Sequence, residues 1–73
     1  MSNEEFASAC AALWGANWKG RAADELGVSY KTVCRWERGD FAVGANVPGE
    51  LAALCIRQIR ALTKLAGQLE KMK

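Results

Sequence analysis

Residues 18–39 read WKGRAADELGVSYKTVCRWERG, and their spacing predicts two short helices joined by a tight turn. The first of these helices ends at Leu26, and Ala22 and Ala23 give it an apolar side together with that leucine. Gly27 follows at the point where a helix end favours a left-handed residue without a Cβ atom. The first helix is therefore expected to stop at this glycine.

The second helix of the pair is predicted to run from Ser29 to Arg38. A serine is a favoured N-cap, and Val33 and Trp36 recur at i and i+3 as an apolar face. Because so few residues separate the two helices, they must cross steeply and pack closely, with the small Ala23 at the crossing. This arrangement is a helix-turn-helix.

The apolar and glycine positions of this run follow a family pattern. Counted from Lys19, the fifth, ninth, fifteenth and eighteenth positions are Ala23, Gly27, Val33 and Trp36. In these positions the run resembles the Cro/repressor-type (XRE-like) helix-turn-helix of small phage and bacterial regulators. The string GVSYKTVCRWERGD is similar to the recognition helix of that family, whereas the flanking segments agree only in length and helical character. The alternative is a helical hairpin in another small bundle.

The resemblance implies that the second helix lies in the major groove of double-stranded DNA, where each base pair presents a distinct pattern. The base-reading positions of the family are matched by Tyr30, Lys31 and Arg35. Arg35 is the strongest candidate, because a guanidinium can bond O6 and N7 of guanine together. Phosphate contacts are expected from Asn17, Lys19, Ser29, Thr32 and Arg38. The alternative is an ordinary solvated helix face.

In many members of the family that this run resembles, an acidic residue near the end of the recognition helix pairs with a basic residue on the first helix. Here Glu37 holds the acidic position, but residues 3–14 contain no Lys or Arg. Glu37 is therefore expected either to pair with Lys19 or Arg21 or to have no such partner.

Length and composition limit the possible functions. The 73 residues predict one domain, residues 1–73, and the apolar fraction of 51% suits a globular fold. No apolar run approaches the roughly 20 residues of a membrane span, and the acidic start lacks the basic region of a secretory signal. Three cysteines and no histidine exclude a Cys/His zinc site and disfavour a disulfide framework. A cytoplasmic protein with reduced thiols, no cofactor, no metal and no small-molecule ligand is expected.

The net charge of +2 is unevenly distributed. Up to residue 30 there are two basic and four acidic residues, and from residue 31 onward there are eight basic and four acidic residues. A positive end of this kind weakly favours a polyanionic partner.

The amino-terminal segment predicts a helix from Asn3 to Trp14. Ser2 and Glu5 have capping-box spacing, and Gly15 ends the segment. Its apolar stripe is formed by Phe6, Cys10, Leu13 and Trp14. This helix is expected to cover the helix pair, which spans residues 17–39.

Residues 40–47 are expected to form an irregular connection in which Phe41 and Val43 pack as local core, with Asn46 near a phosphate. Pro48 opens a long helix at its favoured first position, predicted to span residues 48–72. The first turns of this helix are apolar nearly all round, which predicts burial against the helix pair. The residues concerned are Leu51, Ala52, Leu54, Cys55 and Ile56.

Further along, apolar residues step by three and four, as in a helix–helix seam. A helix of about 24 residues is about 36 Å long, more than such a small core needs. The overhang is therefore expected to pair with a second copy; the alternative is that it folds back or frays. The predicted dimer interface comprises Ile59, Leu62, Leu65, Ala66 and Leu69. The other side of the helix carries Arg57, Arg60 and Lys64, which are expected to be solvated; the alternative is that they contact phosphates.

Together these features predict an all-α helix-turn-helix domain of about four helices that binds operator DNA as a homodimer. The resemblance implies a transcriptional regulator, most simply a repressor of its own promoter, of the kind found in phage operons, including those with anti-CRISPR genes. A protein–protein interaction module, antitoxin-like or docking on another partner, and an excisionase-like architectural factor remain alternatives. An enzyme is disfavoured because there is no histidine, no Ser/His or Cys/His arrangement and no phosphate-binding glycine loop.

Overall fold

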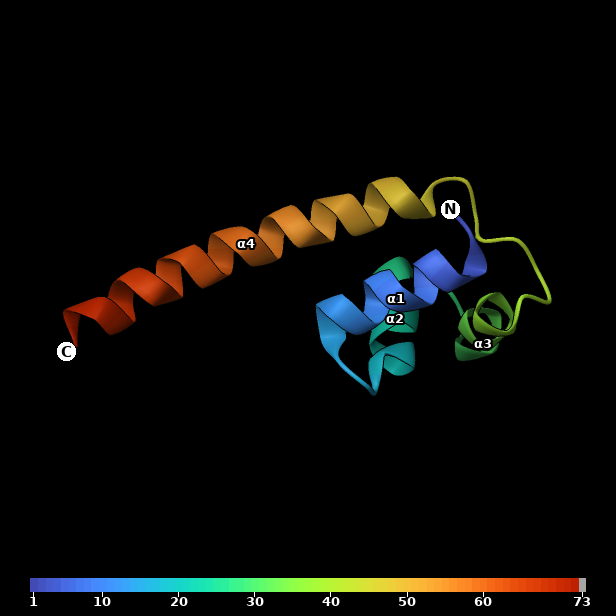
Figure 1. Cartoon of the computed structure of the whole chain (residues 1–73), viewed down its shortest axis with the longest axis horizontal. Coiled ribbons are helices and arrows are strands. Elements are labelled where there is room, and N and C mark those ends of the chain that lie inside the picture. The colour runs from blue at the N-terminus through green and yellow to red at the C-terminus, as the bar shows by residue number, and fades with distance from the viewer. Residues whose placement is uncertain (73) are drawn as a thin grey trace.

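The computed structural model describes residues 1–72, which form four helices and no strand (Figure 1). The helices are α1 (Asn3–Trp14), α2 (Trp18–Leu26), α3 (Tyr30–Arg38) and α4 (Val47–Lys71). Helices α1, α2 and α3 pack on one another as a small body, and α4 runs beside α1 and then continues past it. The predicted all-α fold with a long carboxy-terminal helix is confirmed.

Local signals set the two ends of α1 where the sequence predicts them. The hydroxyl of Ser2 accepts a hydrogen bond from the Glu5 amide (3.0 Å), and the Ser2 amide donates to the Glu5 carboxylate (2.8 Å). This capping box also lowers the pKa of Glu5, chiefly because the Ser2 amide bonds to its charged form. At the other end Gly15 adopts φ 85°, and its amide donates to the carbonyl of Ala11 (2.8 Å).

The core is centred on Phe6, which is fully buried. Its ring meets Trp18 and Trp36 edge to face, with ring centroids 5.6 and 5.4 Å apart. Cys10 and Val33 are also fully buried, so α1, α2 and α3 all contribute to one apolar cluster. Burial raises the pKa of the Cys10 thiol to about 11, so this thiol is neutral at physiological pH.

The short turn between α2 and α3 is compatible with a helix-turn-helix. Gly27 is left-handed (φ 67°, ψ 32°), and the next amide, that of Val28, donates to the carbonyl of Ala23 (3.1 Å). The Ser29 hydroxyl then accepts from the Thr32 amide (3.1 Å) and caps α3, which begins at Tyr30. The small Ala23 is buried where the helices cross, as predicted.

Gly20 is the third residue of α2 and has no packing reason to be glycine. A Cβ atom there would meet no other atom within 4 Å. We expect Gly20→Ala to raise the free energy of unfolding by about 0.5–1 kcal/mol, because alanine loses less backbone entropy in a helix. Chemical denaturation measures this change. Gly27→Ala is the matched control, and its left-handed backbone should make the same substitution destabilising. Loss of stability in Gly20→Ala would contradict the expectation.

Helix α4 begins at Val47, one residue earlier than predicted, with Pro48 in its first turn. Val47 and Leu51 are buried and Leu54 is partly buried against the core. The predicted burial of the other residues in these turns is wrong, because α4 touches the body along one side only. The exposed residues are Ala52, Cys55 and Ile56.

Arg57 lies on the solvated side of α4, as predicted, but its exposed side chain also contacts the body. Its guanidinium contacts the Glu25 carboxylate of α2 at 3.1 Å, and Arg21 contacts the same carboxylate at 3.3 Å. Beyond this point α4 projects from the body (Figure 1). The molecule is consequently elongated, with extents of 49 × 21 × 20 Å.

Candidate nucleic-acid interface

Helix α3 has one apolar face and one basic face. Val33 and Trp36 point into the core and are buried. Lys31, Arg35 and Arg38 follow at i, i+4 and i+7, so they share the opposite face of the helix. Lys31 and Arg38 are exposed and Arg35 is partly buried. The segment Tyr30–Arg38 therefore presents three cations away from the core.

The predicted base-reading residues differ in how firmly they are held. Tyr30 is 56% exposed, whereas the guanidinium of Arg35 lies over the ring of Phe41, 5.2 Å from its centroid. A cation over an aromatic face is attracted by the ring quadrupole and loses rotamer freedom. Phe41 was predicted to pack as local core, and that prediction is wrong. Phe41 is 53% exposed and lies at the surface, where its ring contacts Arg35.

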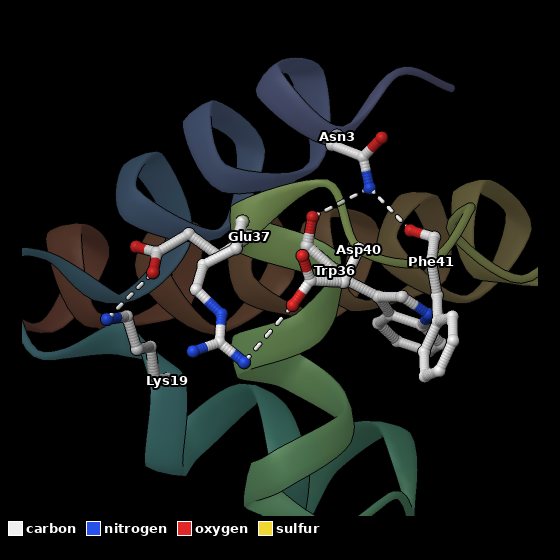
Figure 2. A network of polar contacts seen from close by, with 7 residues as sticks. Asn3, Lys19, Trp36, Glu37, Asp40 and Phe41 are labelled. Carbon is white, nitrogen blue, oxygen red and sulfur yellow. Dashed lines mark hydrogen bonds and ion pairs between the residues drawn. The ribbon is translucent and has the colours of Figure 1, made fainter.

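Asn3 fixes the loop that carries Phe41. The side-chain amide of Asn3 donates to the carbonyl of Trp36 at 2.7 Å and to the carbonyl of Phe41 at 2.8 Å (Figure 2). The first carbonyl lies in the last turn of α3, which needs partners outside the helix. Asn3 thus joins α1, the end of α3 and the following loop at one point.

Lys19, a predicted phosphate contact, is engaged within the chain. Its ammonium lies 2.9 Å from the Glu37 carboxylate, and both side chains are about one-third exposed (Figure 2). The hydrogen bond to Glu37 raises the pKa of Lys19. Of the two partners that the sequence allows for Glu37, the structure therefore selects Lys19 over Arg21. Any phosphate must share Lys19 with this acid.

Other predicted phosphate contacts are also partly engaged. Arg38 lies 3.2 Å from the Asp40 carboxylate, with both side chains more than half exposed. The hydroxyl groups of Ser29 and Thr32 are 2.9 Å apart, and the first of these also caps α3. Only one of the two hydroxyl groups donates in this contact, so the O–H of the other can still donate to a phosphate oxygen.

Asn17 stands at the N-cap position of α2, but its side chain makes no capping hydrogen bond. Asn17 is exposed. A shallow recess of about 190 Å³ lies here, lined by Ala16, Asn17, Lys19, Gly20 and Tyr30. Free amide groups at the start of a helix and a nearby ammonium suit an anion.

Two features of this surface escape prediction from sequence, namely the roles of Asn3 and Phe41. The carbonyls that Asn3 bonds are 33 and 38 residues further along the chain. Asparagine in the first turn of a helix gave no signal of such contacts. The proximity of an aromatic residue to the last turn of α3 is the one sequence feature that could have suggested a ring beneath Arg35.

The sequence matches no family model, no curated protein and no solved structure at a significant level. Within residues 1–72, no helix combines the length and apolar character that a membrane crossing requires. The same residues contain no group of three or more potential metal ligands. The geometry of α2, α3 and their surroundings is therefore the basis for proposing a function.

Proposed function

We propose that the chain is a sequence-specific, double-stranded DNA-binding transcriptional regulator that inserts α3 into the major groove. The observation that carries this proposal is the two-sided character of α3. Its inner face is locked by Val33 and Trp36, while Lys31, Arg35 and Arg38 project from the other face. The major groove admits a helix of this kind, and its base edges offer acceptors to such cations.

Within this proposal the residues have distinct roles. Arg35, held by Phe41, reads a guanine, and Tyr30 and Lys31 contact neighbouring bases. Phosphates are contacted by residues at the start of α2 and along α3, which fix the register of α3 without reading sequence. These are Asn17, Lys19, Ser29, Thr32 and Arg38.

A regulator of this size acts most simply as a homodimer on an inverted repeat, repressing its own promoter by occupying it. The exposed stripe on α4 supports pairing, because Ile59, Leu62, Leu65 and Leu69 are each about half exposed. Footprinting on DNA upstream of the coding region, read for a two-fold repeat, tests this proposal. Affinity should fall by powers of ten between about 50 and 200 mM salt if several phosphates are contacted.

A protein–protein interaction module is the second candidate function, favoured by that same apolar stripe on α4. In this case α3 would be a solvated basic helix. Salt distinguishes the two functions, because apolar docking lacks the steep counterion release of DNA binding. DNA binding that is absent, or insensitive to salt, would favour the interaction module.

Glu37 is expected to weaken DNA binding by competing for Lys19. We expect Glu37→Gln to increase affinity for all DNA sequences, because it removes an acid beside the interface and releases the ammonium. The slope of log affinity against log salt concentration should steepen by about the amount expected for one additional phosphate contact. Titrations at several salt concentrations measure both effects, with Glu50→Gln on α4 as the control. Unchanged or weaker binding would show that Lys19 does not contact the phosphate backbone.

A further inference from the structure

The chain exposes more surface than a folded monomer of its mass should. Its accessible surface is 5163 Å², whereas the scaling for monomeric proteins gives about 4,400 Å² for 7.9 kDa. The excess of about 750 Å² is close to the roughly 800 Å² that each partner buries in a standard interface. The radius of gyration, 14.3 Å, likewise exceeds the roughly 11 Å of a compact chain of this length. Both differences reflect the projecting part of α4.

The exposed stripe of α4 continues the face that already packs on the body. Leu51 is buried and Leu54 is partly buried against the core. Helical steps of three and four carry the same face on to Leu62, Leu65 and Leu69, which are 55%, 47% and 52% exposed. Among residues 1–72, no segment lies beside this end of α4 (Figure 1).

An apolar groove lies beside the start of this exposed stripe. It has a volume of about 340 Å³ and runs between α1 and α4. Its lining is formed by Ala9, Ala12 and Leu13 from α1 and by Cys55, Gln58, Ile59 and Leu62 from α4. Alanines on α1 leave space for large side chains from outside.

We propose that this groove receives the carboxy-terminal turns of α4 from a second copy of the chain. The two α4 helices would run antiparallel about a two-fold axis near Leu62. With that axis, Ile59 faces Leu65 of the partner subunit, and Cys55 faces Leu69 of the partner subunit. The proposal deepens the homodimer of the proposed function and rests on it for the number of chains. It does not depend on DNA.

Burial distinguishes the antiparallel arrangement from a parallel one. In a parallel pair the two overhangs cover each other. Each groove remains empty, because both bodies then lie at the same end of the helix pair and neither overhang reaches the other copy's groove. In the antiparallel pair each overhang fills the other copy's groove, so both apolar surfaces are removed from water. Arg60 and Lys64 lie about half a turn away from the stripe, so their charges point away from the seam.

The first test is the molar mass in solution of the intact chain and two variants. We expect the unmodified chain to have the mass of two copies by light scattering. Ala12→Glu should reduce the mass to one copy, because it places a carboxylate in the groove. Ala11→Glu is the matched control and should remain dimeric, because Ala11 is exposed on α1 but does not line the groove. Circular dichroism checks that both variants are folded.

The second test determines the direction of pairing with the native Cys55, which is exposed. In a Cys34→Ser background, Leu69→Cys should give an oxidised dimer through Cys55 of one copy and position 69 of the other. Adding Cys55→Ser should abolish that cross-link. A cross-link that survives would join position 69 to itself, which shows parallel pairing and overturns the proposal.

The possible failures are separable. An unmodified chain with the mass of one copy would overturn both the pairing and the dimeric part of the proposed function. A dimer that tolerates Ala12→Glu would overturn this pairing mode alone. Both measurements are made without DNA, so DNA binding by a single domain is decided by its own titration.

Discussion

Arg35→Ala should weaken binding to the operator by about 1–3 kcal/mol, roughly 5- to 150-fold in Kd, and relax preference at one base pair. The reason is geometric. The guanidinium can bond O6 and N7 of guanine together, and its position over the Phe41 ring reduces the freedom it loses on binding. Competition titrations with operators changed at single positions would measure both affinity and preference.

Matched variants separate the reading of a base by Arg35 from the contribution of its positive charge. Arg35→Lys keeps the cation but loses the planar fork, so it should retain binding to random DNA while losing the base preference. Lys19→Ala should weaken all sequences alike, because a phosphate contact carries no sequence information. Arg60→Ala, an exposed cation on α4, should leave the base preference unchanged. Unaltered affinity and preference in Arg35→Ala would exclude α3 as the reading element through this residue.

The helix boundaries could be predicted from sequence because they depend on neighbouring residues. Ser2 and Glu5 form their capping box within one turn, and Ser29 caps α3 within the same distance. Gly27 and Gly39 end α2 and α3 in the left-handed conformation that glycine tolerates best. The inward direction of Val33 and Trp36 followed from helical periodicity, as did the outward direction of Lys31.

The contacts that shape the basic surface could not be predicted, because they join residues far apart in the chain. Asn3 reaches the carbonyls of Trp36 and Phe41, which are 33 and 38 residues away. Hydrophobicity alone predicted that Phe41 is buried, but an exposed aromatic ring can also bind a cation on its face, as Phe41 does with Arg35. The geometry of the candidate site therefore required the structure, whereas its residue types did not.

The burial of α4 was overestimated for a related reason. A segment that is apolar nearly all round predicts a buried helix, but burial needs neighbours on every side. In residues 1–72 α4 packs mainly on α1, and only lightly, so Leu51 is buried whereas Ile56 is 52% exposed. An apolar face without a neighbour in the same chain indicates where another chain can bind.

Phe6→Ala should largely unfold the domain, which is the greatest change in stability expected for one substitution here. Removing a fully buried phenylalanine costs about 3–5 kcal/mol, and the edge-to-face contacts with Trp18 and Trp36 place Phe6 toward the upper end of that range. A core of this size supplies roughly 3–5 kcal/mol of net stability. The stability lost in Phe6→Ala is therefore comparable with the entire free energy of unfolding. Helical circular dichroism at 25 °C and chemical denaturation would measure it.

Phe41→Ala is the matched control, since Phe6 and Phe41 are the two phenylalanines of the chain. The ring of Phe41 is 53% exposed, so its removal should lower the free energy of unfolding by no more than about 1 kcal/mol. The same variant should reduce base preference, because Arg35 loses the ring that holds it. Similar destabilisation by the two substitutions would contradict the division of roles, in which Phe6 supports the core and Phe41 supports the basic face.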